Sequence, residues 1–170
     1  MGGVNAQQFA LDYPQLVRGI VLIDADPAFK DNPGMPEFFR EVLKLEGSID
    51  WAFMDEFQKS TLSNPIDTAY YHLLVNEGLK VPLQVFKDAF KGIMEVDYRN
   101  HLNKITAPVL IMWVEKDGIC FRKNQEQLRK GISNAILIVY ENTGHALHWQ
   151  EPKRFADDLV VFISNLDPTL

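Results

Sequence analysis

The stretch that decides the fold is residues 143–152, Thr-Gly-His-Ala-Leu-His-Trp-Gln-Glu-Pro. It follows an apolar run rich in β-branched residues at 135–140 and precedes a segment with helical periodicity. His145 is therefore predicted on a loop at the end of a buried strand, where a rigid scaffold can hold an imidazole in place. Gly144, directly before it, permits a backbone path that a residue with a Cβ resists.

A second apolar run, residues 108–113, leads into Val-Glu-Lys-Asp at 114–117. Runs that are apolar on both faces are typical of parallel strands covered by helices. An acid after one strand and a histidine after the next is the arrangement of a catalytic pair. Because ligands bind outside the carboxyl ends of parallel strands, we expect Asp117 and His145 to meet there within hydrogen-bonding distance.

The remaining periodicity alternates between strands and helices, except for a long helical insertion after the first strand. Strands alternating with helices predict an α/β fold with a parallel sheet and right-handed crossovers. The core is expected to comprise residues 1–28 and 103–170, with the helical insertion at 29–102. Helices are expected at 4–13, 36–45, 51–60, 67–79, 82–94, 123–130 and 152–165, and strands at 17–23, 108–114 and 135–140.

Composition limits the class of protein. The chain has 170 residues, 46% of them hydrophobic and 24% charged, as expected for a globular domain with a substantial core. A net charge of -6 argues against nucleic acid or an anionic membrane as a partner. The single cysteine, Cys120, excludes an intramolecular disulfide. The first residues lack the basic and apolar regions of a signal peptide, so a cytoplasmic location is expected.

Residues 1–24, Met-Gly-Gly-Val-Asn through Leu-Ile-Asp, resemble the segment that follows the nucleophile in the α/β-hydrolase superfamily, where the elbow reads Gly-x-Ser-x-Gly. Met1 and Gly2 are similar to the last two positions of that elbow. The helical insertion resembles the family's cap. Residues 108–117 and 143–145 resemble the segments that deliver the triad acid and histidine. The resemblance covers essentially the whole chain, and its parts follow the family order.

This resemblance implies roles for named residues. His145 would be the general base and acid, Asp117 would orient it, and the backbone nitrogen of Met1 would take the oxyanion position after the serine. The implied substrate is a small, largely apolar molecule with an ester, amide or carbon–carbon bond, and neither a cofactor nor a metal is implied. Trp51 and Phe53 are candidates, among the aromatic residues of the insertion, for lining the substrate pocket.

The assignment of the acid has alternatives. Glu115 lies two residues from Asp117, and Asp24 and Asp26 follow the strand at 17–23, a position that some related hydrolases use for the acid. Val114 stands where family members commonly have glycine. We favour Asp117 over the other three.

The histidine-rich stretch allows two further interpretations, a structural role for His148 and a metal site. His148 is expected to pack or form hydrogen bonds near the site. His145, His148 and Glu151 are not expected to bind a metal, because no further ligand cluster supports them.

The Gly-x-Ser half of the elbow is absent from the sequence, so the chain as given is expected to be nearly inactive alone. Two alternatives remain open. One is an inactive fragment or a binding module that uses the pocket under the insertion. The other is half of a split hydrolase, complemented by an N-terminal half. The strand at 17–23 is expected to be an unpaired edge, which favours poor solubility or dimerisation through that edge.

Overall fold

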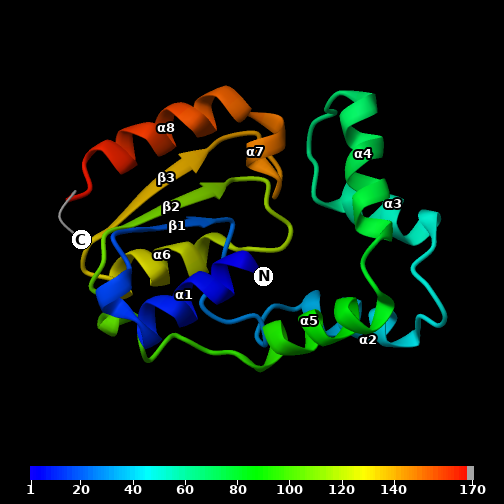
Figure 1. Cartoon of the computed structure of the whole chain (residues 1–170), viewed down its shortest axis with the longest axis horizontal. Helices are drawn as coiled ribbons and strands as arrows, with labels where there is room; N and C mark the ends of the chain where they lie inside the picture. The colour runs from blue at the N-terminus through cyan, green and yellow to red at the C-terminus, as the bar shows by residue number, and fades with distance from the viewer. Residues whose placement is uncertain (168–170) are drawn as a thin grey trace.

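The computed structural model describes residues 1–167, and its core is a parallel sheet. In these residues the strands β1 (Ile20–Ile23), β2 (Val109–Val114) and β3 (Ala135–Tyr140) pair in the order β1-β2-β3. All three strands run in the same direction, so their carboxyl ends meet at one edge of the sheet (Figure 1). The predicted α/β fold is confirmed.

Helices cover both faces of this sheet. α1 (Gly2–Asp12) and α6 (Arg122–Gly131) lie on one face, and α8 (Pro152–Ser164) lies on the other (Figure 1). The short helix α7 (Leu147–Gln150) connects β3 to α8. None of the helices in residues 1–167 is long and apolar enough to span a bilayer.

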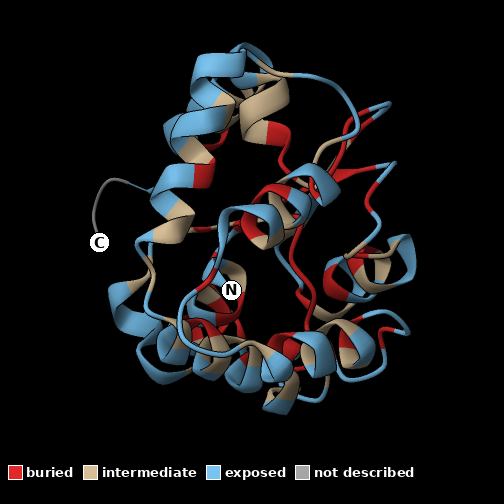
Figure 2. Cartoon of the chain, turned by 90° about the vertical axis from the view of Figure 1, so that its right-hand side faces the viewer, coloured by how far each residue is buried: buried red, intermediate tan, exposed pale blue. Residues whose placement is uncertain are grey.

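The central strand β2 is buried along its whole length, because both of its faces are covered. Val109 and Ile111 belong to the apolar cluster on the side of α1 and α6, whereas Leu110 and Met112 pack with Phe162 of α8. Figure 2 shows the buried residues along the strands and on the inward sides of the helices. The uninterrupted apolar run in the sequence therefore reflects burial on two sides.

The helical insertion (residues 29–102) contains α2 (Met35–Lys44), α3 (Trp51–Ser60), α4 (Thr68–Leu79) and α5 (Leu83–Glu95). These helices lie beyond the carboxyl ends of the strands (Figure 1). They share an apolar cluster of their own, separate from the two clusters of the sheet. Its buried members are Val42, Ile49, Met54, Val75 and Phe86.

Local chemistry explains where two helices of the insertion begin. The Asp50 side chain accepts a hydrogen bond from the Phe53 N–H at 2.8 Å, and Asp67 accepts one from the Tyr70 N–H at 2.9 Å. Each aspartate caps N–H groups that have no partner within the helix. α3 and α4 consequently start one residue after their capping aspartates, at Trp51 and Thr68.

Two predicted boundaries need correction. The strand expected at 17–23 begins only at Ile20, because Pro14–Leu16 forms a 3-10 helix and pairing with β2 starts opposite Val109. The loop expected before residue 152 contains α7, a single helical turn. A second 3-10 helix, Leu102–Lys104, leads from the insertion back to the sheet.

Candidate active site

Asp117 lies three residues beyond β2, and its side chain is fully buried. Its Oδ1 atom accepts hydrogen bonds from the backbone N–H groups of Ile119, at 2.7 Å, and Cys120, at 3.0 Å. Hydrogen bonds from two N–H donors to one carboxylate oxygen are strong and directional. They also fix the orientation of the carboxylate and leave Oδ2 for another donor.

That donor position is taken by His145. The Nδ1 atom of His145 lies 2.9 Å from Asp117 Oδ2, and the histidine side chain is 28% exposed. The contact arises because β2 and β3 are neighbours whose last residues, Val114 and Tyr140, pair in register. A carboxylate acceptor at Nδ1 selects the tautomer with the proton on that atom, which leaves Nε2 as a free base.

The rival acids are engaged elsewhere. Asp24 Oδ1 accepts the Val114 N–H at 3.0 Å, and Asp26 accepts the side-chain amide of Gln125 at 2.9 Å. Glu115 is exposed. The structure therefore brings His145 to Asp117 and not to the other candidates.

Asp24 and Asp26 have pKa values well above the usual range of an aspartate. Burial, together with the negative charge of Asp117, raises the pKa of Asp24 to about 9. Burial also raises the pKa of Asp26, to about 7, although a hydrogen bond from Asn124 opposes the shift. At neutral pH the folded protein therefore holds Asp24 in its neutral form, as expected for buried carboxyls beside another acid.

Met1 lies at the N-terminal end of α1, at the edge of the sheet where the strands end (Figure 1). The Met1 carbonyl accepts the N–H groups of Val4, at 3.0 Å, and Asn5, at 3.2 Å. α1 packs closely on the residues that follow β1, because Gly3 lacks a Cβ, which would lie 2.4 Å from the Ala25 Cβ.

Cys120 is buried, and burial raises the pKa of its thiol. The thiol donates a hydrogen bond to the Asp24 carbonyl at 2.9 Å. Asp117, Cys120 and His145 offer three ligand atoms within 4.8 Å of one another. The Asp117 and His145 side chains are hydrogen-bonded to each other, and the Cys120 thiol is hydrogen-bonded to the Asp24 carbonyl. Each of the three groups therefore already has a hydrogen-bond partner in the protein.

The structure also places the three aromatic residues that the sequence suggested near the site, His148, Phe53 and Trp51. The His148 ring lies next to Trp149 and Phe155, and burial lowers its pKa, with a further contribution from His145. Phe53 packs against aromatic rings of the insertion's own cluster. Trp51 is 49% exposed, and its ring contacts His72.

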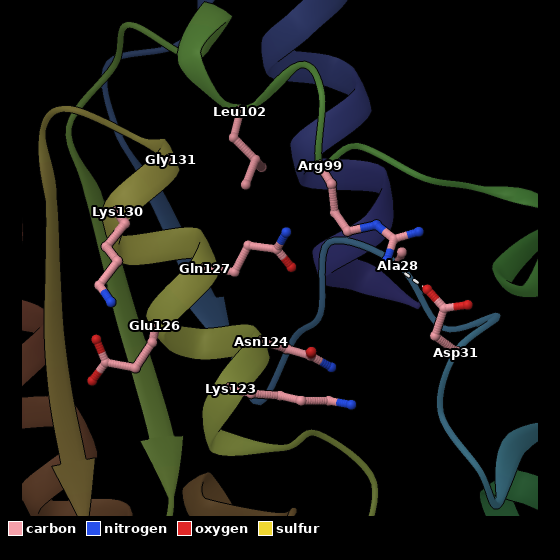
Figure 3. Close-up of a pocket in the computed structure, with 10 residues that line it drawn as sticks. All are labelled: Ala28, Asp31, Arg99, Leu102, Lys123, Asn124, Glu126, Gln127, Lys130 and Gly131. Carbon is pink, nitrogen blue, oxygen red and sulfur yellow. Dashed lines mark hydrogen bonds and ion pairs between the residues drawn. The ribbon is translucent and has the colours of Figure 1, made fainter.

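A cavity of about 660 Å³ lies on the α6 face of the sheet rather than at the Asp117–His145 pair. Figure 3 shows that charged side chains line this cavity. Arg99 and Asp31 form an ion pair on one side, and Lys123 and Lys130 come from α6 on the other. Neither Asp117 nor His145 contributes to its lining. The cavity is therefore distinct from the candidate site.

Residues 1–153 match the family described as serine aminopeptidase, S33. The chain belongs to this α/β-hydrolase family. The pimeloyl-[acyl-carrier protein] methyl ester esterase of Salmonella newport is 24% identical over 177 residues, which cover 98% of this chain and 68% of that protein.

Solved structures of α/β-hydrolases share the fold. An esterase from Exiguobacterium antarcticum superposes with a TM-score of 0.85 at 20% identity, covering 96% of this chain and 63% of that one. The enol-lactonase of Burkholderia xenovorans LB400 superposes with a TM-score of 0.81 at 14% identity, covering 97% and 63%. The chain thus spans less than two thirds of the length of these solved hydrolases.

Sequence reasoning missed one part of the site. The turn between α3 and α4 contacts the loop that carries His145, through Thr61, Ser63 and Asn64. In the sequence this turn is recognised only as the break at Asn64-Pro65, which indicates a helix end and nothing about its partner.

Proposed function

We propose that this chain supplies the acid and the base of a Ser-His-Asp site that cleaves carboxylic esters. The observation that carries the proposal is the contact of 2.9 Å between His145 Nδ1 and the buried Asp117 carboxylate. In such a site the imidazole takes the proton of a serine hydroxyl and later returns it to the leaving group. Membership in a hydrolase family and the esterase relatives support the ester as substrate.

This geometry supports a role for each residue. Asp117 is fixed by its two backbone donors, so it orients the His145 ring and stabilises the positive charge that the ring acquires during catalysis. The nucleophile is expected immediately before Met1, on the N-terminal side of α1. The N-terminus of α1 then favours the oxyanion, because its first N–H groups have no partner within the helix.

The helical insertion is proposed to serve as the cap over the site. It lies beyond the carboxyl ends of the strands, the edge where ligands bind in parallel sheets (Figure 1). An apolar substrate group would bind between the insertion and the strand ends. Trp51, which is exposed, is a better candidate for this contact than Phe53, which packs in the insertion's own cluster.

The test uses the chain together with the segment encoded in frame before Met1, which should contain Gly-x-Ser. This longer protein should hydrolyse p-nitrophenyl butyrate. His145→Ala and Asp117→Asn should each lower kcat by roughly 10²- to 10⁴-fold. His101→Ala, at an exposed histidine of the insertion, is the matched control and should leave kcat unchanged.

Two results would overturn the proposal. Undiminished hydrolysis by the His145→Ala variant would remove the base from its assigned role. An in-frame stop codon directly before Met1, together with no gain of hydrolysis from any separately encoded chain carrying Gly-x-Ser, would leave the pair without a nucleophile.

A further inference from the structure

The loop that carries His145 is held from two directions. On one side it continues from β3, and on the other it contacts the turn between α3 and α4. We call residues 141–146 the histidine loop and residues 61–64 the insertion loop. The Ala146 N–H donates to the Thr61 carbonyl at 3.1 Å. The Asn142 carbonyl accepts the Asn64 side-chain amide at 2.8 Å and the Ser63 hydroxyl at 3.3 Å.

Gln150, at the end of α7, adds a third connection. Its Oε1 atom accepts the Asn64 N–H at 2.9 Å, the Ser63 hydroxyl at 3.2 Å and the Ser63 N–H at 3.3 Å. Its Nε2 atom is buried and has no hydrogen-bond partner among the described residues. Two of the three donors are backbone N–H groups, which can only donate. The Gln150 side-chain atom that faces them must therefore be the oxygen, and this fixes the orientation of the amide.

The two loops are also in close steric contact. A Cβ on Gly144 would lie 2.5 Å from the Ser63 nitrogen and 3.0 Å from the Thr61 carbonyl oxygen. Both are backbone atoms, so the contact cannot be relieved by a side-chain rotation. Gly144 and Ala146 therefore touch the insertion loop on either side of His145 in the sequence.

From these contacts we infer that Gln150 is a positioning residue: it locks the insertion loop to α7, which directly follows the histidine loop, and so reinforces the direct hydrogen bonds between the two loops. The position of His145 is then set jointly by β3 and by the helical insertion. The imidazole is held in its productive place only while the insertion is docked. The catalytic part of this inference rests on the proposed role of His145 as the base, whereas the lock itself does not.

Amide hydrogen exchange in the chain tests the lock without any activity. Gln150→Ala should accelerate exchange at the N–H groups of Ala146 and Asn64, while exchange at Ile111 of β2 stays unchanged. Gln150→Glu keeps an accepting oxygen and replaces the unpartnered amide nitrogen, so it should retain slow exchange. Gln127→Ala, at an exposed glutamine of α6, is the control.

Kinetics of the longer, serine-bearing protein test the positioning role. Small displacements of a catalytic group can cost up to about 10²-fold in rate. Gln150→Ala should therefore lower kcat by about tenfold or more and change KM less than about twofold. Gln150→Glu should restore kcat. A residue that only stabilised the fold would reduce the amount of active protein and would not show this rescue by glutamate.

Asn64→Ala is the second variant, because Asn64 is exposed and its loss leaves the apolar clusters intact. This substitution removes the hydrogen bond to the Asn142 carbonyl. It should accelerate amide exchange and lower kcat, as Gln150→Ala does, but each effect should be smaller. Unchanged exchange at Ala146 in both variants would overturn the lock. Faster exchange with unchanged kcat would overturn the positioning role. Neither result touches the proposed function, which instead fails if the His145→Ala variant stays active.

Discussion

Asp24→Asn tests whether the buried acid beside Asp117 is protonated in the folded protein. Asp24 is 4% exposed, its Oδ1 accepts the Val114 N–H, and its Oδ2 has no hydrogen-bond partner among the described residues. Burial is the main cause that raises its pKa to about 9, and the Asp117 charge adds to it. Asparagine keeps the accepting oxygen and imitates the neutral acid, so the substitution should preserve the local structure.

The sign of the effect follows from the direction of the shift. In the unfolded chain an aspartate ionises near pH 4, whereas Asp24 in the folded chain keeps its proton up to about pH 9. Between these values the unfolded state has released a proton that the folded state retains, so the free energy of unfolding falls as pH rises. The slope is at most about 1.4 kcal/mol per pH unit, or roughly 4 kcal/mol from pH 5 to 8.

Urea unfolding at several pH values between 5 and 8 measures this slope. Asp26, with a pKa of about 7, contributes to the slope in both proteins, so the difference between them isolates Asp24. The free energy of unfolding of Asp24→Asn should rise relative to that of the wild type as pH increases. Asp157→Asn, at an exposed residue of α8, should give a curve parallel to the wild type. If the free energies of unfolding of the wild type and of Asp24→Asn changed in parallel with pH, the prediction that Asp24 is protonated in the folded protein would be refuted.

Three further predictions follow from burial and from the sheet edge. Leu22→Ala should lower the free energy of unfolding by about 2–5 kcal/mol, because Leu22 is fully buried, whereas Val161→Ala, at a residue 63% exposed, should change it by less than about 0.5 kcal/mol in urea unfolding. The Cys120 thiol should react with a disulfide reagent only as fast as the protein opens, since it is buried and burial raises its pKa; rapid labelling of the folded protein would contradict this. β1 pairs only with β2 among the described strands, so residues 1–170 expressed by themselves are expected to be poorly soluble or to dimerise through the other side of β1; a soluble, monodisperse monomer in size-exclusion chromatography with light scattering would contradict this.

The strands and the acid–histidine contact could be predicted from the sequence because few arrangements satisfy an alternating α/β pattern. β2 is buried on both faces, so its residues form one continuous apolar run that stands out in the sequence. β1 was harder to delimit. Val17 looks like a strand residue, but the 3-10 helix at Pro14–Leu16 takes its N–H, which donates to the Pro14 carbonyl at 3.3 Å.

The contacts of the helical insertion were beyond prediction for a physical reason. Adjacent parallel strands bring their following loops together, so the proximity of Asp117 and His145 follows from topology alone: Val114 pairs with Tyr140, and each loop starts from one of them. No such rule links the turn at Ser63 to Gln150, which lies 87 positions away in the chain.

Polar residues in a turn are usually solvated, and their spacing carries no sign of a distant partner. Yet the turn at residues 61–64 supplies hydrogen bonds on both sides of His145. The acid and base of the proposed site are thus placed by the sheet, which the sequence pattern encodes strongly. Their fine position depends on the helical insertion, whose contacts depend on individual side chains such as Gln150. Substitutions at the insertion loop should therefore shift His145, and with it alter catalysis, while leaving the sheet intact.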